Sequence, residues 1–341
     1  MEKNNDFLLE VKNLKKWFPT QHGLSALFLK EKTYVRAVDG ISFSVKRGET
    51  FCIIGESGSG KTTTGKMIMR LLEPTDGDII FNGKNVSHIK GKELKEYRRN
   101  VQMIFQDPYA SMNPRFKIKQ VLAEPLVIHK IGDSKKYRDE NSKKLLESVK
   151  VTPAEEFMDR FPHMLSGGQR QRVSIARGVS LSPALIVADE PVSMIDLSTR
   201  AEILAMMKSL KRDFGLTYIY ITHDLSTARY FADTIAVMYL GKIVEIGNAD
   251  DIVDNPIHPY TRVLINAVCE PLPGKVKKMK EINIKGEIPS AAKIPPGCRF
   301  HTRCVFADED CKTFPEPDLM DIGNGHYHSC RRSDDLQKFK F

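Results

Sequence analysis

The stretch GESGSGKT, Gly55 to Thr62, decides the fold of this 341-residue chain. It matches the pattern G-x-x-x-x-G-K-[ST], in which glycines let the backbone curl so that successive N–H groups face a phosphate chain. The β-branched and apolar run TFCII before it is typical of a buried strand, and KTTTGKMIMRLL after it has a helical pattern that ends before Pro74. Strand, glycine loop and helix in this order predict a phosphate-binding loop, where a chance glycine-rich turn is the alternative.

The residue types of this loop assign its chemistry. Lys61 is expected to reach the β- and γ-phosphates, and the hydroxyl of Thr62 is expected to face Mg²⁺. The predicted contacts to the nucleotide are Gly55, Glu56, Ser57, Gly58, Ser59, Gly60, Lys61, Thr62 and Thr63.

Strand-like and helix-like segments alternate after the glycine loop. ALIVAD (184–189) and TYIYIT (217–222) are apolar runs of the kind buried in parallel sheets, and residues 197–214 have the pattern of a long helix. Residues 118–161 are rich in Lys and Glu with apolar residues at helical spacing, which predicts a mainly helical insertion. This alternation predicts an α/β fold with a parallel sheet.

Two carboxylates stand at the end of the apolar strand ALIVAD. Ligands of open α/β sheets lie at the carboxyl ends of the strands, and consecutive strand residues point to opposite sides. We therefore expect Asp189 to face Mg²⁺ and Glu190 to act as the general base on the attacking water. A pair of helix-capping residues is the alternative interpretation of these two carboxylates.

Two further polar residues follow predicted strands. Gln106 comes after VQMIF and His223 after TYIYIT, so both are expected at the same sheet edge as Asp189. An amide can ligate Mg²⁺ or orient water, and an imidazole can donate a hydrogen bond to a γ-phosphate. Either residue alone is more often structural.

The stretch MLSGGQRQR, Met164 to Arg172, has the character of a second, incomplete phosphate site. A short flexible bend at Ser166, Gly167 and Gly168 precedes a predicted amphipathic helix. Helix N-termini offer free N–H groups and a partial positive charge, which suits a phosphate.

Together, GESGSGKT, QDP, LSGGQ, LIVADEP, SMID and THD resemble the ATP-binding cassette (ABC) ATPase family over Leu9 to about Gly247. The resemblance implies an ABC-type P-loop NTPase cassette: a mixed sheet core, an antiparallel β subdomain and a helical subdomain at about 115–182. It implies ATP and Mg²⁺ as ligands. The expected domains are a cassette at 7–254 and a C-terminal extension with four cysteines at 255–341.

In that family two cassettes dimerise head to tail with ATP between them. The resemblance implies that Ser166, Gly168 and Gln169 touch the γ-phosphate and ribose bound by a partner, and that Gly167 permits the close approach. Asp196 would act across the same interface, although SMID departs from the usual Ser-Ala-Leu-Asp. An upstream aromatic residue should stack on adenine. Phe18 is the predicted one, with Trp17 or Tyr34 as alternatives.

The C-terminal stretches NPIHPYTRVLINAV and GCRFHTRCVFADEDC resemble the extension of oligopeptide/dipeptide importer ATPases, and YVRAVDGISFSV favours the F-type subunit. This implies a D-type ATPase partner, two membrane permease subunits and an extracellular solute-binding protein. The cargo would be peptides, or oligosaccharides as in some relatives. A nucleic-acid-associated ABC ATPase is disfavoured because there is one cassette only, so no nucleic acid is expected. A non-hydrolysing scaffold is disfavoured because Glu190 and His223 are present.

Four of the six cysteines gather near the C-terminus: Cys298, Cys304, Cys311 and Cys330. A reducing cytosol disfavours disulfides, so the group predicts a metal site. The spacing C-x5-C-x6-C-x18-C matches neither the usual zinc finger nor the ferredoxin pattern. Resemblance to peptide-importer ATPases implies a [4Fe–4S] cluster, despite Val305 where relatives have Pro. His301, His326 and His328 leave zinc open, and free thiols remain a third alternative.

Composition places the chain among soluble globular proteins. It carries a formal net charge of +9 and shows neither a signal-peptide pattern nor a run of roughly 18 apolar residues. We therefore expect a cytoplasmic protein, peripheral on the membrane through its partners. The basic cluster KVKKMK (275–280) is interpreted as a solvated linker, with an anionic surface as the alternative.

Overall fold

The computed structural model describes residues 6–20, 33–132, 134–268 and 286–333. The chain divides into two compact units. The first comprises residues 1–45, 51–88 and 222–341, and the second comprises 46–50 and 89–221. The glycine loop and the C-terminal extension therefore belong to one unit. The basic cluster at 275–280 and Cys269 lie outside the described residues.

The first unit contains a four-stranded antiparallel sheet of order β2-β1-β4-β5. Its strands are β1 (Phe7–Pro19), β2 (Tyr34–Lys46), β4 (Asp76–Phe81) and β5 (Lys84–Asn85). Leu9 of β1 pairs with Phe81 of β4, and the register shifts between Lys12 and Lys15. β1 and β2 extend beyond the apolar runs at 7–11 and 41–45, because backbone pairing continues past those runs.

A second sheet in this unit carries the glycine loop. Its strands within the unit run in the order β11-β12-β10-β9-β3. The bounds are β3 (Thr50–Ile54), β9 (Thr234–Tyr239), β10 (Lys242–Asn248), β11 (Met320–Asp321) and β12 (Tyr327–His328). β3 and β9 are parallel, whereas β9, β10, β12 and β11 pair antiparallel. The C-terminal extension thus adds two short strands to the sheet that contains β3.

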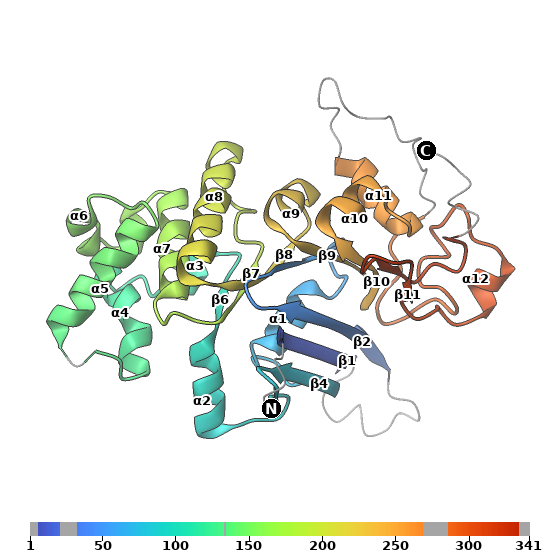
Figure 1. The fold of residues 1–341 in the computed structure, drawn as a ribbon, viewed down its shortest axis with the longest axis horizontal. Helices are drawn as coiled ribbons and strands as arrows, with labels where there is room; N and C mark the ends of the chain where they lie inside the picture. Colours follow the sequence, from blue (N-terminus) through green and yellow to red (C-terminus); the bar gives the residue numbers. More distant parts are fainter. Residues whose placement is uncertain (1–5, 21–32, 133, 269–285, 334–341) are drawn as a thin grey trace. The chain divides into compact units, whose positions relative to one another are not determined.

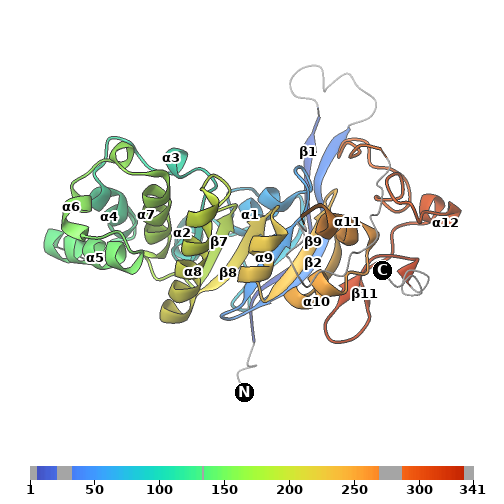
Figure 2. The same cartoon turned by 90° about the horizontal axis from the view of Figure 1, so that it is seen from above.

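Helices complete the first unit, as Figures 1 and 2 show. They are α1 (Lys61–Ile68), α9 (Leu225–Phe231), α10 (Ala249–Asp254), α11 (Pro259–Val268) and α12 (Glu309–Thr313). The stretch NPIHPYTRVLINAV begins at Asn255, but α11 begins at Pro259. Proline fixes its own φ and disfavours helical backbone in the residue before it, so Pro256 and Pro259 delay the start.

The second unit contains the parallel strands β6 (Val101–Ile104), β7 (Leu185–Asp189) and β8 (Thr217–Thr222). All residues of β7 and β8 are buried, as expected for a parallel sheet. The helices are α2 (Gly91–Asn100), α3 (Pro108–Ser111), α4 (Ile118–Ile128), α5 (Lys135–Ser148), α6 (Ala154–Met158), α7 (Gly167–Val179) and α8 (Leu197–Phe214). Helices α4 to α7 gather into one group, and α4 to α6 lie within the stretch 118–161 that was predicted to be mainly helical (Figure 1).

Within the described residues, no helix combines the length and the apolar character that crossing a bilayer requires.

Candidate nucleotide and metal sites

The glycine loop between β3 and α1 is shaped by close backbone approaches. Gly55 has φ +154°, and a Cβ there would lie 2.2 Å from the carbonyl oxygen of Met238. Gly60 has φ +110°, and a Cβ there would lie 2.2 Å from the carbonyl oxygen of Ala37. Side chains at either position would force the loop away from β9 and β2. The two glycines therefore permit the close packing of the loop backbone against β9 and β2.

Lys61 occupies the centre of this loop. Its buried ammonium donates hydrogen bonds to the carbonyl oxygens of Gly55 at 2.7 Å and Glu56 at 2.9 Å. Gly60, the residue before α1, offers no side-chain cap to the helix. A helix N-terminus without a side-chain cap is of the kind that suits a phosphate. Thr62, which follows Lys61, is exposed.

The second unit brings together two of the predicted catalytic residues. Gln106 follows β6 and Glu190 follows β7, and the Nε2 of Gln106 donates to Oε2 of Glu190 at 3.0 Å. The N–H of Glu190 donates to the carbonyl of Ile221 at 2.8 Å. Glu190 also has φ +47°, an uncommon conformation for a non-glycine residue. This contact confirms that the ends of β6 and β7 meet at one edge, as the sequence predicted.

Asp189 is the last residue of β7 and is buried, with 6% of its surface exposed. Glu190 is half-buried and His223, the residue after β8, is exposed. The difference between Asp189 and Glu190 fits the predicted division of tasks, a buried ligand and a water-facing base. These two roles, and that of His223 on the γ-phosphate, stay predictions.

The stretch MLSGGQRQR, Met164 to Arg172, is called the signature stretch from here on. It forms a reciprocal cap at the start of α7. The Oγ of Ser166 accepts from the N–H of Gln169 at 3.2 Å, and Oε1 of Gln169 accepts from the N–H of Ser166 at 3.0 Å. Such a capping box satisfies two helix N-terminal donors at once. Ser166 and Gly167 are exposed on the second unit. The motif is therefore ordered and presented at a surface, as a site completed by another cassette requires.

Buried Arg170 ties α7 to the segment that precedes it. Its Nε and Nη2 donate to the carbonyls of Pro162 at 2.9 Å and Leu165 at 2.7 Å, and its guanidinium stacks 3.3 Å from the ring centroid of Tyr109. Tyr109 belongs to α3, three residues after Gln106. The signature helix and the segment after Gln106 are thus joined by one side chain.

The stretch SMID, Ser193 to Asp196, is held by contacts from α8. Ile195 is buried and Met194 is exposed. Arg200 donates from Nε to the carbonyl of Ile195 at 2.7 Å and from Nη2 to that of Ser193 at 3.2 Å. Asp196 itself precedes α8 without capping it and is exposed. Its predicted action across a dimer stays a prediction.

The aromatic residues proposed for adenine lie on β1 and β2. The indole N–H of Trp17 donates to Asp39 at 2.8 Å, and the guanidinium of Arg36 lies 4.8 Å from the Trp17 ring. Phe18 is half-buried, with the ammonium of Lys16 5.3 Å from its ring. Phe18 stays the predicted adenine contact, with Trp17 and Tyr34 as the alternatives.

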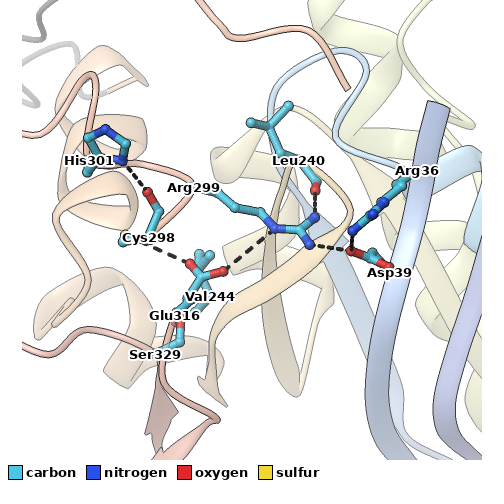
Figure 3. Close-up of polar contacts among 9 residues, drawn as sticks. All are labelled: Arg36, Asp39, Leu240, Val244, Cys298, Arg299, His301, Glu316 and Ser329. Atoms are coloured by element: carbon cyan, nitrogen blue, oxygen red, sulfur yellow. Dashed lines mark hydrogen bonds and ion pairs between the residues drawn. The ribbon is translucent and has the colours of Figure 1, made fainter. Parts of the chain in front are cut away.

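Asp39 is the centre of a charge network that joins β2 to the C-terminal extension (Figure 3). Buried Arg299 donates to the Asp39 carboxylate and to the carbonyl of Leu240, and Arg36 lies 3.7 Å from the same carboxylate. Burial raises the pKa of Asp39, but the bonds from Arg299 and Trp17 outweigh it and hold that pKa below its usual value. The Arg299 side chain therefore holds this part of the C-terminal extension against β2.

The four C-terminal cysteines line one small cavity of about 20 Å³. Cys298 and Cys304 lie on the loop before α12, Cys311 lies in α12, and Cys330 follows β12. The N–H of Cys298 donates to the carbonyl of Cys311 at 2.8 Å, which holds two of the four close together. Thiols are the donors that soft metal centres use, so the donor chemistry of these four residues suits the predicted group.

Burial of the thiols sets their protonation. It raises the pKa of Cys304 to about 11 and that of Cys330 to about 12, and it also raises the pKa values of Cys298 and Cys311. The thiols therefore hold their protons at neutral pH unless a metal displaces them, and metal uptake would release protons.

Two residues near this cavity were not predicted from the sequence. His258, Cys298 and Glu316 bring one ligand atom each within 4.8 Å of one another. Burial lowers the pKa of His258 to about 3 and raises that of Glu316 to about 7. The sequence shows a His and a Glu within the C-terminal extension, but nothing in the sequence distinguishes these two from the other His and Glu residues there.

The three histidines that left zinc open point to other partners. His326 pairs with Glu245 through Nε2 at 2.8 Å, and Nδ1 of His328 accepts from the N–H of Cys330 at 3.1 Å. Nδ1 of His301 donates to the carbonyl of Cys298 at 2.8 Å (Figure 3). Of the three, His301 alone lines the cysteine cavity.

Comparison with known proteins agrees with this geometry. Residues 38–193 match the family described as ABC transporter, and residues 244–311 match the family described as oligopeptide/dipeptide transporter, C-terminal region. The chain is 43% identical over 328 residues to the oligopeptide transport ATP-binding protein AppF of Bacillus subtilis, covering 96% of this chain and 98% of that one. This chain belongs to the ABC transporter ATP-binding protein family.

A second relative and one solved structure support the same assignment. The chain is 42% identical to the dipeptide transport ATP-binding protein DppF of Haemophilus influenzae, covering 96% of this chain and 97% of that one. A dimeric post-hydrolysis structure of the ATP-binding cassette MJ0796 with ADP and Pi matches with a TM-score of 0.61 at 28% identity, covering 71% of this chain and 98% of that chain. The predicted cassette fold is confirmed, and the chain is an ABC ATPase.

Proposed function

We propose that this chain hydrolyses ATP to power peptide import through separate membrane subunits. The observation that supports the proposal most strongly is the pairing of a complete cassette with an extension of the oligopeptide/dipeptide transporter type. The relatives named for oligopeptide and dipeptide transport match this chain nearly end to end. Import of oligosaccharides by the same machinery is the alternative cargo.

The proposed assembly contains a second, D-type ATPase, two permease subunits and an extracellular solute-binding protein, with this chain at the cytoplasmic face. ATP would lie between the glycine loop of one cassette and the signature stretch of the other. The exposed, pre-capped N-terminus of α7 supports this arrangement. ATP would then hold the two cassettes together, and hydrolysis would release them.

Within that site we propose Thr62, Gln106 and Asp189 as the surroundings of Mg²⁺, Glu190 as the general base and His223 as a γ-phosphate contact. Asp196 would act from the partner cassette. The hydrogen bond from Gln106 to Glu190 supports a joint role in which the amide orients the base.

Cellular uptake tests the cargo. In cells lacking this chain, uptake of labelled tri- to pentapeptides should be lost and should return with the wild-type chain. The Lys61→Ala variant should fail to restore it, because Lys61 is the predicted ligand of the β- and γ-phosphates. Uptake of labelled oligosaccharides is measured in the same cells. If oligosaccharide uptake depends on the chain and peptide uptake does not, the peptide assignment is wrong.

We also propose that Cys298, Cys304, Cys311 and Cys330 hold a [4Fe–4S] cluster with a structural role, with Zn²⁺ as the alternative. The four-thiol donor set supports the proposal. Such a cluster, when bound, would cross-link three segments of the extension. Iron, sulfide and zinc analysis of anaerobically purified protein tests it. About four iron and four sulfide per chain are expected. If the protein instead contains about one zinc per chain and no sulfide, the cysteines hold zinc and the cluster assignment is wrong.

A further inference from the structure

Glu56 places a carboxylate inside a loop that binds a polyanion. The phosphate-loop pattern leaves this position open to any residue, so the motif itself does not require a charge there. A carboxylate and a triphosphate repel each other, more strongly when part of the solvent is excluded. The chain therefore needs to neutralise Glu56 if the loop is to bind ATP well.

The neutralising group comes from the C-terminal extension. Arg303 forms a two-pronged ion pair with Glu56, with 2.7 Å between Nη1 and Oε2 and 3.0 Å between Nη2 and Oε1. The Arg303 side chain is 6% exposed and that of Glu56 is 25% exposed. Bidentate pairs of this kind fix orientation as well as charge. The N–H of Glu56 also donates to the hydroxyl of Tyr260 at 2.9 Å, so α11 holds the same loop residue.

Arg303 is itself held in place. Its backbone N–H donates to the carbonyl of Phe300 at 3.0 Å, and its guanidinium lies 5.8 Å from the ring centroids of both Tyr239 and Phe300. Four residues earlier, Arg299 is fixed on Asp39, as Figure 3 shows. The guanidinium is therefore pre-positioned against the loop and does not have to be ordered when ATP binds.

We propose that Arg303 is a positioning residue for ATP, which cancels the charge of Glu56 and holds the first limb of the phosphate loop. The inference depends on ATP binding by this family and on no particular metal at the cysteines. Without Arg303, the Glu56 carboxylate would face the triphosphate unopposed and its loop segment would lose one of its anchors. Nucleotide affinity would fall, whereas the chemical step, which Arg303 does not touch, would change little.

A double-mutant cycle tests this inference in the purified full-length protein, with MgATP affinity measured by competition against a fluorescent ATP analogue. Arg303→Ala should raise the Kd about tenfold, and Glu56→Gln alone should keep it within about threefold of wild type. In the Glu56→Gln background, Arg303→Ala should cost less than threefold, because no charge remains to be cancelled. A purely structural role of Arg303 would instead give the same loss in both backgrounds.

Three further measurements complete the experiment. Arg303→Lys keeps the positive charge and should recover most of the affinity, within about threefold of wild type. Arg229→Ala removes an arginine from an exposed ion pair with Asp254 and should leave the Kd unchanged. In the assembled transporter, Arg303→Ala should raise KM for ATP while kcat stays within about threefold.

Equal losses with and without the Glu56 carboxylate would overturn the inference, and so would wild-type affinity in Arg303→Ala. If Arg303→Ala does not fold, Arg303→Lys and Glu56→Gln still decide it. Arg303→Lys keeps the positive charge and Glu56→Gln removes the negative one. A tenfold loss of ATP affinity in both variants contradicts charge cancellation, and affinity close to wild type in both supports it. Peptide uptake is not among these readouts, so failure of the cargo assignment would be recognised separately.

Discussion

The first two residues of α7, Gly167 and Gly168, differ in what an added methyl group would meet. A Cβ on Gly168 would lie 2.9 Å from Cγ2 of Thr199 in α8, whereas a Cβ on Gly167 would have no heavy atom within 4 Å. The two alanine variants are therefore matched in chemistry and in helix position, and they differ in one steric contact. We expect Gly168→Ala to destabilise the protein relative to Gly167→Ala.

The size of this difference follows from the geometry. Both substitutions gain up to about 1 kcal/mol of helix propensity, so that contribution cancels in the comparison. Carbon atoms pack at about 3.5–4.0 Å, so Thr199 or α7 must move by roughly 0.6 Å or more. Overpacking of this kind costs about 1–3 kcal/mol. Thr199→Ser removes the methyl group involved and should reduce the difference to about 0.5 kcal/mol or less.

Urea unfolding followed by circular dichroism, with hydrogen exchange at the amides of α7, measures the effect in the full chain. ATP hydrolysis by the assembled transporter is measured in parallel. Gly167→Ala should be at least as stable as wild type but at least about tenfold slower in ATP hydrolysis, because its methyl group occupies the predicted approach of the partner's γ-phosphate. Equal stability of the two alanine variants would refute the steric argument. Full activity of Gly167→Ala would refute the predicted role of this surface.

Three other outcomes are expected. Glu190→Gln keeps the hydrogen bond to Gln106 but cannot accept a proton, so ATP turnover should fall about 10²–10⁴-fold while ATP binding persists; normal turnover would exclude Glu190 as the base. Asp39→Asn should lower stability at neutral pH, and the difference from wild type in urea unfolding should shrink below about pH 4, because a carboxylate with a lowered pKa loses its contribution as pH falls through the folded-state value. Phe300→Ala should destabilise the unit that contains Arg299 by about 3–5 kcal/mol in thermal unfolding, because it empties a fully buried aromatic site.

Features with a strong local pattern were predictable from the sequence. The bounds of α8, residues 197–214, match the predicted helix, since its apolar spacing is regular and Gly215 ends it in a left-handed conformation. The glycine loop and the two buried strands β7 and β8 were also located correctly, because each has a composition that few other structures share. The predicted meeting of Gln106 with the end of β7 followed from parallel pairing alone.

Features that depend on tertiary contact were not predictable. The lengths of β1 and β2 depend on strand pairing rather than on apolar runs. Glu56 and Arg303 are 247 residues apart, and no periodicity in either segment indicates the other. His258 and Glu316 likewise approach Cys298 only because three separate segments of the first unit fold together. The resemblance to a family identified the cysteines as a group but not these neighbours.

The segment from Cys298 to Cys304 connects the cysteine cavity with the phosphate loop, two features that are far apart in the sequence. Its first and last residues line the cysteine cavity, and between them Arg299 and Arg303 form buried ion pairs with Asp39 and Glu56. Buried ion pairs contribute little net stability, whereas removing one partner of such a pair costs several kcal/mol. A segment that served only to fix the tail would therefore gain little from two buried arginines that apolar residues could replace. Their presence is explained more simply if they act on what they contact, which for Arg303 is the phosphate loop.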